Sequence, residues 1–297
     1  MKYDAIVIGG GFAGLSAATY LARGRRMVCV IDTGKPRNRF ARASHGFLAQ
    51  DGSPPLSILA RAREQVMAYP TVRLIDSEAV GARGEDGSFH VVLADGEQIE
   101  ARKAILAFGL RDDIPSLPGL AQRWGRAVLH CPYCHGIEFS DQPLGVLYRT
   151  PMSARQASMV AEWGPTTLYL DGAALPSDSA AALADRGVRI EPGKLRRLVG
   201  DGDTLSAIEL DGGRQCAVSA LYIAPQSCLA SPLAEQLGAE IEDGPLGPQV
   251  KTDADRMTSI SGLYAAGDIA RAPHSVAWAV ADGVTAGTSA HRALVFG

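Results

Sequence analysis

Residues 5–14 read Ala5-Ile6-Val7-Ile8-Gly9-Gly10-Gly11-Phe12-Ala13-Gly14, and this stretch decides the fold of the chain. The four residues before the glycines form an apolar run, which is typical of a parallel strand buried on both faces. The next six residues match the pattern G-x-G-x-x-G, and good helix formers follow from Leu15 to Arg23. The stretch therefore predicts a buried strand, a tight glycine turn and a helix that begins at the turn.

Each glycine in the pattern has a physical reason. Gly9 permits the tight turn, Gly11 lets the backbone approach a pyrophosphate where a Cβ would stand in the way, and Gly14 lets the helix pack close to the strand. Phe12 and Ala13 lie in the glycine turn just before the expected helix, whose free N–H groups and positive dipole end attract phosphate. We therefore expect these residues to bind the phosphates of a dinucleotide.

A second apolar run, from Met27 to Ile31, ends in Asp32, which follows Gly14 by 18 residues. An acidic residue at that distance can accept hydrogen bonds from ribose hydroxyls. The loop that follows is basic, and we place its Arg37 and Asn38 beside the adenosine half of the nucleotide. A solvated basic loop without a ligand is the alternative interpretation.

Two further segments favour FAD over NAD as the nucleotide. Residues Ser261 to Asp268 resemble the second FAD motif of flavoproteins with two dinucleotide domains, in which the Asp binds the ribityl chain. Residues Ala104 to Gly109 resemble the A-T-G strand of the same proteins, with Phe108 where Thr is usual. By this resemblance, the FAD-binding residues include Ala107, Gly109, Gly267 and Asp268.

The composition is that of an ordinary globular protein, with 297 residues, 46% of them hydrophobic, and a net charge of −3. This charge favours neither nucleic acid nor an anionic membrane as a partner. Five cysteines do not make a secreted disulfide framework. The uncharged stretch from Ala5 to Ala22 contains the glycine turn and lacks a basic segment before it, so we expect neither a signal peptide nor a membrane helix. The chain is predicted to be cytoplasmic.

The string His130-Cys131-Pro132-Tyr133-Cys134-His135-Gly136 has several possible meanings. A glutaredoxin carries C-P-Y-C near the start of its own domain, whereas here an FAD half-domain precedes it. Covalent haem attachment to C-x-x-C-H belongs to an exported protein. A zinc site would need the neighbouring ligands His130 and Cys131 to close a tetrahedron, and no second C-x-x-C is present, so no metal is predicted here. A redox-active pair beside a flavin is the interpretation that suits the rest of the chain.

With these motifs in this order, the chain resembles a low-molecular-weight thioredoxin reductase over nearly its whole length. The resemblance implies an α/β fold with two dinucleotide-binding domains. A discontinuous Rossmann-like FAD domain would comprise residues 1–114 and 245–297. A smaller NAD(P)-binding-like domain, residues 115–244, would be inserted into it and carry the C-x-x-C pair. The resemblance also implies a homodimer.

The resemblance further assigns roles to the redox pair. Cys134 would lie nearer the flavin, and Cys131 would exchange with the substrate as a thiolate. His135 takes the place of the Asp that donates and accepts protons in thioredoxin reductases. An imidazole can do the same with a pKa nearer neutral. His130 is a secondary candidate for this work.

The second dinucleotide site of the family is altered in this sequence. We expect a strand-helix-strand unit there. It comprises a strand from Leu144 to Tyr148, a helix from Ser153 to Trp163 with Ser153 as its N-cap, and a strand from Thr166 to Leu170. The turn between the first strand and the helix contains no glycine, and Asp171 stands where a 2′-phosphate would need basic residues. An NAD(P)H site is therefore doubtful.

A reductase fold without its reductant site suggests electron flow in the other direction. The C-P-Y-C-H-G string is similar to that of the dithiol oxidases of gliotoxin, holomycin and related disulfide natural products. The resemblance implies that electrons pass from a substrate dithiol to the cysteine pair, to FAD and to O₂ or another acceptor. His274 and Ser275 replace the Arg-Gln pair of thioredoxin reductases and are placed near the isoalloxazine or the substrate, a surface turn being the alternative for His274.

Two other functions stay open. The first is a reductase of thioredoxin or a small disulfide, supplied by NAD(P)H or ferredoxin. The second is a flavin-bound redox sensor without turnover. In each enzyme the partner is a small dithiol or disulfide, or a thioredoxin-like protein.

Overall fold

The computed structural model describes residues 2–297, and β1 (Lys2–Ile8) lies at the centre of its larger sheet. The strand order is β3-β2-β1-β6-β5-β4, with β19 beside β6. These strands are β2 (Val28–Asp32), β3 (Val72–Asp76), β4 (Ala79–Glu85), β5 (Ser88–Leu93), β6 (Gln98–Leu106) and β19 (Leu263–Ala265). Strands β2, β1, β6 and β19 run parallel, with Ile8 opposite both Ile31 and Leu106, and Ala265 also opposite Leu106. The segments after these strands therefore meet at one edge of the sheet, where open α/β sheets bind their ligands.

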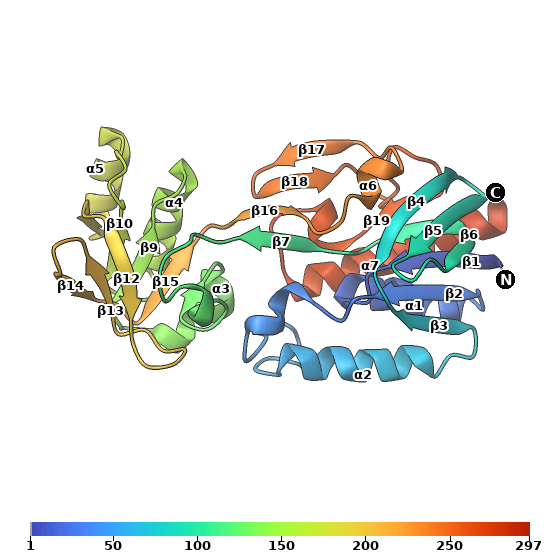
Figure 1. The fold of residues 1–297 in the computed structure, drawn as a ribbon, viewed down its shortest axis with the longest axis horizontal. Coiled ribbons are helices and arrows are strands. Elements are labelled where there is room, and N and C mark those ends of the chain that lie inside the picture. Colours follow the sequence, from blue (N-terminus) through green and yellow to red (C-terminus); the bar gives the residue numbers. More distant parts are fainter. Residues whose placement is uncertain (1) are drawn as a thin grey trace.

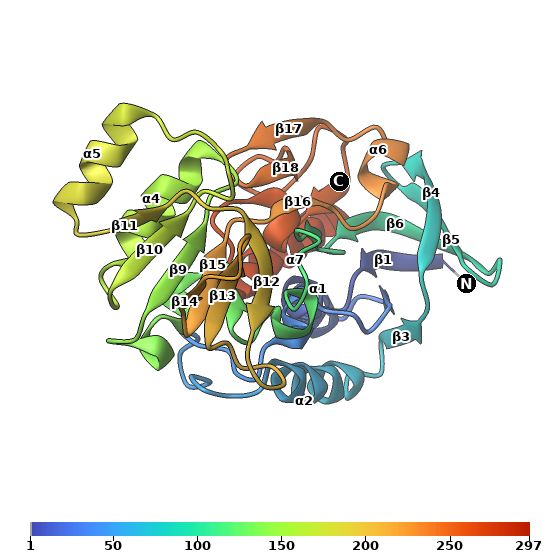
Figure 2. The same ribbon diagram turned by 60° about the vertical axis from the view of Figure 1, so that its left-hand side comes forward.

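The two faces of this sheet are covered differently. Helices α1 (Phe12–Arg23), α2 (Pro55–Met67) and α7 (Val276–Phe296) cover one face, and α1 packs directly against α7 (Figures 1 and 2). A Cβ on Gly283 would lie 2.1 Å from the carbonyl oxygen of Ala13, so the glycine permits this close packing. The other face is covered by α6 (Leu233–Gln236) and a hairpin of β17 (Ile241–Gly244) and β18 (Gly247–Val250).

The second body contains a five-stranded sheet in the order β11-β10-β9-β15-β8. Its strands are β8 (Val128–Leu129), β9 (Leu144–Leu147), β10 (Thr166–Tyr169), β11 (Arg189–Glu191) and β15 (Ala220–Ile223). The helices α4 (Pro151–Val160) and α5 (Ser177–Asp185) follow β9 and β10. A small sheet of β12 (Leu195–Val199), β13 (Ala207–Leu210) and β14 (Gln215–Ala217) completes this body. Helix α4 begins at Pro151 after the N-cap Thr150, so the expectation that Ser153 is the N-cap was wrong.

The chain passes between the two bodies twice. The crossing strands, β7 (Leu110–Asp113) and β16 (Gln226–Leu229), pair antiparallel and form the ribbon between the bodies in Figure 1. After the second crossing, Leu233 and Leu237 pack in the core of the larger sheet. We therefore propose that the FAD domain resumes at β16 rather than at residue 245.

Within residues 2–297, none of the helices combines the length and apolar character needed to cross a membrane.

Candidate active site

The glycine turn after β1 has the geometry that a phosphate cradle needs. Gly9 has a φ of +108°, and a Cβ there would lie 2.2 Å from the carbonyl oxygen of Ala107, at the end of β6. A Cβ on Gly14 would lie 1.8 Å from the carbonyl oxygen of Gly9, so this residue sets the distance between helix and strand. Around Gly11 the space for a Cβ is open to 4 Å, and no side chain caps α1. The first N–H groups of α1 thus have no side-chain acceptor and lie beside the open space at Gly11, which fits a pyrophosphate.

Asp32 lies at the end of β2 beside this turn. Its Oδ1 accepts a hydrogen bond from the backbone N–H of Gly10 at 3.0 Å, and Arg63 Nη1 donates to its Oδ2 at 2.9 Å. Arg63 comes from α2 and also pairs with Asp76 at the end of β3. Arg63 could not be identified from the sequence, because a single basic residue on an amphipathic helix carries no signal of its own.

The second predicted FAD motif, residues 261–268, packs against the first, residues 9–14. The 3₁₀ turn η4 (Gly267–Ala270) follows β19, and Gly267 has a φ of +80°. A Cβ at Gly267 would lie 2.9 Å from the Cβ of Ala13 in the first turn of α1. The contact brings Asp268 next to the glycine turn, although the two motifs are far apart in the sequence. Gly109, with a φ of +74°, ends the segment between β6 and β7.

Arg37 occupies the centre of a buried charge cluster. It lies in η1 (Arg37–Phe40), where Asn38 is half-buried beside it. Its Nη1 is 2.8 Å from Asp268 Oδ2 and 2.8 Å from His274 Nδ1, and its Nη2 is 2.6 Å from Asp112 Oδ1. These contacts place Arg37 beside Asp268, while its expected place beside the adenosine half stays a prediction. Burial opposes the ionisation of Asp112, but hydrogen bonds and charge from Arg37 outweigh it and lower the Asp112 pKa.

Two members of this cluster, Asp112 and Ser227, were not identified from the sequence. They come from the paired crossing strands β7 and β16, and Ser227 Oγ donates to Asp112 Oδ1 at 2.8 Å. The site thus includes the connection between the two bodies. A polar residue in a short connecting strand shows no recognisable pattern, because its partner lies 115 residues away.

His274 and Ser275 have different environments. His274 is half-buried against Arg37, so it belongs to the charge cluster rather than to a surface turn. Burial lowers the His274 pKa, against the opposing charge of Asp268. Ser275 is the N-cap of α7, and its Oγ accepts a hydrogen bond from the N–H of Trp278 at 3.1 Å. This capping bond gives the serine a structural role, and its expected place near the isoalloxazine or the substrate stays a prediction.

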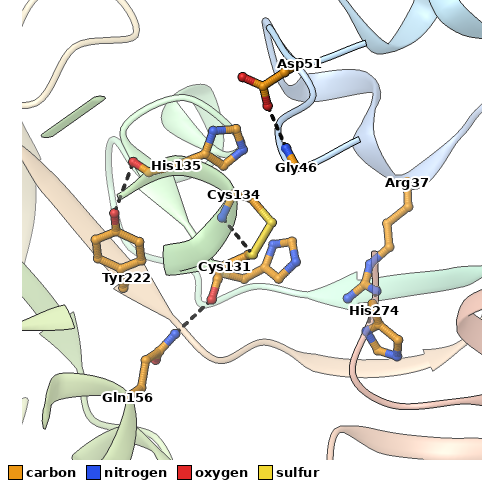
Figure 3. Close-up of a disulfide and its surroundings, with 10 residues drawn as sticks. Arg37, Gly46, Asp51, Cys131, Cys134, His135, Gln156, Tyr222 and His274 are labelled. Carbon is orange, nitrogen blue, oxygen red and sulfur yellow. Dashed lines mark hydrogen bonds between the residues drawn. A yellow bond between two sulfur atoms is a disulfide. The ribbon is translucent and has the colours of Figure 1, made fainter. Parts of the chain in front are cut away.

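The redox pair begins a short helical turn in the second body. Cys131 is the N-cap of α3 (Pro132–His135), and Pro132 is its first helical residue. Cys131 and Cys134 form a disulfide, both are half-buried, and Cys131 Sγ accepts a hydrogen bond from the N–H of Cys134 at 3.1 Å (Figure 3). The same N–H can stabilise a Cys131 thiolate after reduction, because hydrogen bonds to a charged form lower its pKa.

His135 lies at the end of α3 and faces a loop of the first body (Figure 3). Its ring packs edge to face against His45, with 5.9 Å between the ring centroids. Burial lowers the pKa of His135, an effect that Glu138 opposes and His45 reinforces. The ring is therefore neutral at pH 7 and able to accept a proton. His45 was not identified in the sequence, where it is an isolated histidine in a loop.

His130 lies just before the pair, with its ring close to the Arg37 cluster. Desolvation by the surrounding protein and the charge of Arg37 lower its pKa to about 4. Its carbonyl oxygen accepts a hydrogen bond from Gln156 Nε2 at 2.9 Å, which ties the start of α3 to α4.

The turn between β9 and α4 differs from the turn before α1, because its backbone N–H groups are bonded within the chain. Ser153 Oγ accepts hydrogen bonds from the N–H groups of Arg149 at 3.1 Å and Thr150 at 3.3 Å. Pro151, the first residue of α4, has no N–H. After β10, Asp171 Oδ1 accepts a bond from the N–H of Leu195 at 2.8 Å. At this turn the N–H groups of Arg149 and Thr150 are therefore used within the chain, and Pro151 has none to offer to a pyrophosphate.

Comparison with known proteins gives matches along the whole chain. A family model described as pyridine nucleotide-disulphide oxidoreductase matches residues 3–157. Thioredoxin reductase sirT of Leptosphaeria maculans is 31% identical over 305 residues, covering 96% of this chain and 92% of that protein.

Two solved structures extend the comparison. An oxidoreductase from Agrobacterium tumefaciens has a TM-score of 0.95 at 42% identity and covers 100% of this chain and 99% of its own. The structure of HlmI has a TM-score of 0.93 at 37% identity, with coverage of 98% and 92%. The α/β fold with two Rossmann-like domains, expected from the sequence, is confirmed.

Proposed function

Because this chain belongs to the pyridine nucleotide-disulphide oxidoreductase family, we propose that it is an FAD-dependent enzyme that oxidises a substrate dithiol to a disulfide. The observation that supports electron flow from the dithiol to FAD is the contrast between the N-termini of helices α1 and α4. The N–H groups at the start of α1 have no side-chain acceptor, whereas those of Arg149 and Thr150, just before α4, bond to Ser153. A pyrophosphate fits the first turn and would meet fewer free donors at the second, which supports an FAD site at the first turn and makes a nicotinamide site at the second doubtful.

The FAD-binding residues are proposed to form three groups. The glycine turn and the start of α1 would hold the pyrophosphate, Asp32 the ribose, and Asp268 with the neighbouring Arg37 the ribityl side. Arg37 is also bonded to Asp112, so its position is maintained when a ligand takes one of its donors. Bound FAD would take two electrons from the reduced cysteine pair and pass them to O₂ with two protons, which gives hydrogen peroxide.

The chemistry of the chain itself is thiol-disulfide exchange. A substrate thiolate attacks Cys131 Sγ, forms a mixed disulfide and expels Cys134 as a thiolate. The second substrate thiol then attacks the mixed disulfide, closes the product disulfide and releases Cys131 in reduced form. His135 is proposed to accept the proton of an attacking thiol, since its imidazole is neutral at pH 7 and lies at the end of the same helical turn.

The alternative is a disulfide reductase supplied by NAD(P)H or ferredoxin. Two observations favour it: a similar protein is called a thioredoxin reductase, and the β9-α4-β10 unit is kept as a parallel strand-helix-strand. In this direction the same cysteines would carry electrons from FAD to a small disulfide or a thioredoxin-like protein.

An anaerobic titration separates the two directions. The oxidised FAD-loaded protein is titrated first with NADPH and then with dithiothreitol, while the flavin absorbance is recorded. The oxidase proposal expects no bleaching with NADPH, bleaching with the dithiol, and recovery with peroxide release when air is admitted. Stoichiometric bleaching by NADPH would overturn the proposed direction.

We also propose that the enzyme is a homodimer, as the resemblance to thioredoxin reductases implies. Exposed apolar side chains on the layer of α1 and α7 support this, among them Tyr20 and Phe296. Multi-angle light scattering of the FAD-loaded protein tests it, and a mass of one chain, 31.2 kDa, would contradict it.

A further inference from the structure

Two imidazoles and a carboxylate meet where the loop of the first body approaches α3. The ligand atoms of His45, His135 and Glu138 all lie within 4.8 Å of one another. His45 Nε2 is 2.8 Å from Glu138 Oε1. His45 belongs to the loop after η1, while Glu138 lies in η3 (Ile137–Phe139), next to α3 and His135. The three side chains therefore join the two bodies of the molecule.

The second ring nitrogen of His45 has a carboxylate partner. His45 Nδ1 lies 3.6 Å from Asp51 Oδ2, and the other oxygen of Asp51 accepts a hydrogen bond from the N–H of Gly46 at 2.7 Å (Figure 3). Histidines that bind metals usually direct their remaining ring N–H to a carboxylate, which orients the ring and makes it a stronger ligand. A small approach of Asp51 to Nδ1 would give His45 this arrangement, while Nε2 already lies 2.8 Å from Glu138 Oε1.

We propose that His45, His135 and Glu138 bind a divalent transition-metal ion, with Zn²⁺ as the best match, and that Asp51 orients His45. Two histidines and one carboxylate are the ligand set of zinc sites that keep an open position for water or a thiol. Zinc ligands lie about 2.0–2.2 Å from the ion, so these atoms reach a common centre by shifts on the order of 1 Å. Such shifts need no change in the fold, because His45 lies on a loop and Glu138 at the surface.

The bound ion would inhibit the enzyme. It would occupy the ring of His135, which the proposed function uses as a base, and it would tether the loop of residues 41–53 to α3. This inhibitory role rests on the proposed function, whereas the binding site itself does not.

Calorimetric titration of Zn²⁺ into the oxidised, FAD-loaded protein tests the site. In this state Cys131 and Cys134 are joined and cannot act as ligands. The wild-type protein is expected to bind one equivalent, and His45→Asn and Glu138→Gln are each expected to weaken binding at least about tenfold. His90→Asn is the matched control, since His90 lies on β5 and contacts Ser88. It is expected to bind zinc as the wild type does.

Two results would overturn the proposed site. One is no saturable heat with the wild type. The other is zinc affinity in both variants equal to that of the wild type, which would mean that zinc binds at other cysteines or histidines. Glu138→Gln changes a partly exposed side chain, so it keeps the test valid if His45→Asn fails to retain FAD. The inhibitory role is tested with the same three variants by adding Zn²⁺ during dithiol turnover. Zinc that binds as expected but leaves turnover unchanged would overturn that role, while absent turnover without zinc would count only against the proposed function.

Discussion

The guanidinium of Arg37 joins Asp268 to Asp112, with 2.8 Å to the first carboxylate and 2.6 Å to the second. Asp268 follows the last strand of the larger sheet, and Asp112 lies on a strand that leaves it for the second body. One cation thus holds together the second FAD motif and the connection between the bodies. All three side chains are largely buried, so neither carboxylate is screened well by water if Arg37 is lost.

Replacement of Arg37 is expected to destabilise the protein strongly. Arg37→Met would leave two neighbouring carboxylates without their shared cation, and breaking a buried pair in this way costs about 3–5 kcal/mol of unfolding free energy. Denaturant unfolding of the FAD-loaded protein measures the loss. The control is Arg42→Met, whose exposed pair with Asp203 contributes about 0–1 kcal/mol. Equal losses in the two variants would contradict the assigned role of Arg37.

Alanine substitutions at Gly11 and Gly14 are expected to have different effects, the first on FAD binding and the second on folding. Gly11→Ala places a Cβ in open space, so the unfolding free energy of the FAD-free protein should change by no more than about 1 kcal/mol. FAD affinity should fall at least tenfold, since the Cβ takes the space proposed for the pyrophosphate. Gly14→Ala would put a Cβ 1.8 Å from a carbonyl oxygen and should prevent a stable fold. Fluorescence titration with FAD and circular dichroism distinguish the two outcomes.

Each cysteine of the redox pair is expected to be indispensable. Cys131→Ser and Cys134→Ser should retain FAD and lose dithiol-dependent peroxide formation, because exchange requires both sulfurs. Cys216→Ser is the control, since this free cysteine lies away from α3 on β14, and it should keep full activity. Turnover that survives in Cys131→Ser would contradict the exchange mechanism. A wild-type protein that shows no turnover at all would instead favour the redox sensor.

The acidic limb of the pH profile is expected to report His135. Burial lowers the pKa of this imidazole below its ordinary value of 6.5, so the neutral, proton-accepting form persists as pH falls toward that lower pKa. In the wild-type enzyme, kcat/KM should therefore be independent of this group above pH 6.5 and decrease only below it. His135→Asn should lower the rate by about 10²–10⁴-fold and remove that limb. A limb of the same midpoint in the variant would assign it to another group.

Capping by Ser153 is expected to matter for stability and not for cofactor choice. Ser153→Ala removes the acceptor of two N–H groups before α4 and should cost about 1 kcal/mol of unfolding free energy. The variant should still fail to bind NADPH, because Pro151 and the side chains of the turn remain. Measurable NADPH binding by the variant would show that the serine alone had closed the site.

Much of the fold, including the sheet edge where Asp32 and Asp268 lie, could be predicted because the signals are local. A glycine that needs a positive φ, an apolar run and a helix start all act within a few residues, and parallel pairing then brings Asp32 and Asp268 to one edge of the sheet. The C-x-x-C pair is equally local, since residues three apart at the start of a helix can form a disulfide. The N-cap of α4 was misassigned by three residues because both Thr150 and Ser153 can cap, and the backbone before Pro151 decides between them.

The sequence by itself determined the dinucleotide turn, the redox pair and the loss of glycine before α4, since each depends on residues next to one another. Only the tertiary structure decided that Arg37 meets Asp112 and Asp268, and that His45 meets His135 and Glu138. These contacts depend on how the crossing strands β7 and β16 set the second body against the first. The residues that neighbour a charged or imidazole side chain in the sequence do not indicate which distant residue folding will bring into contact with it.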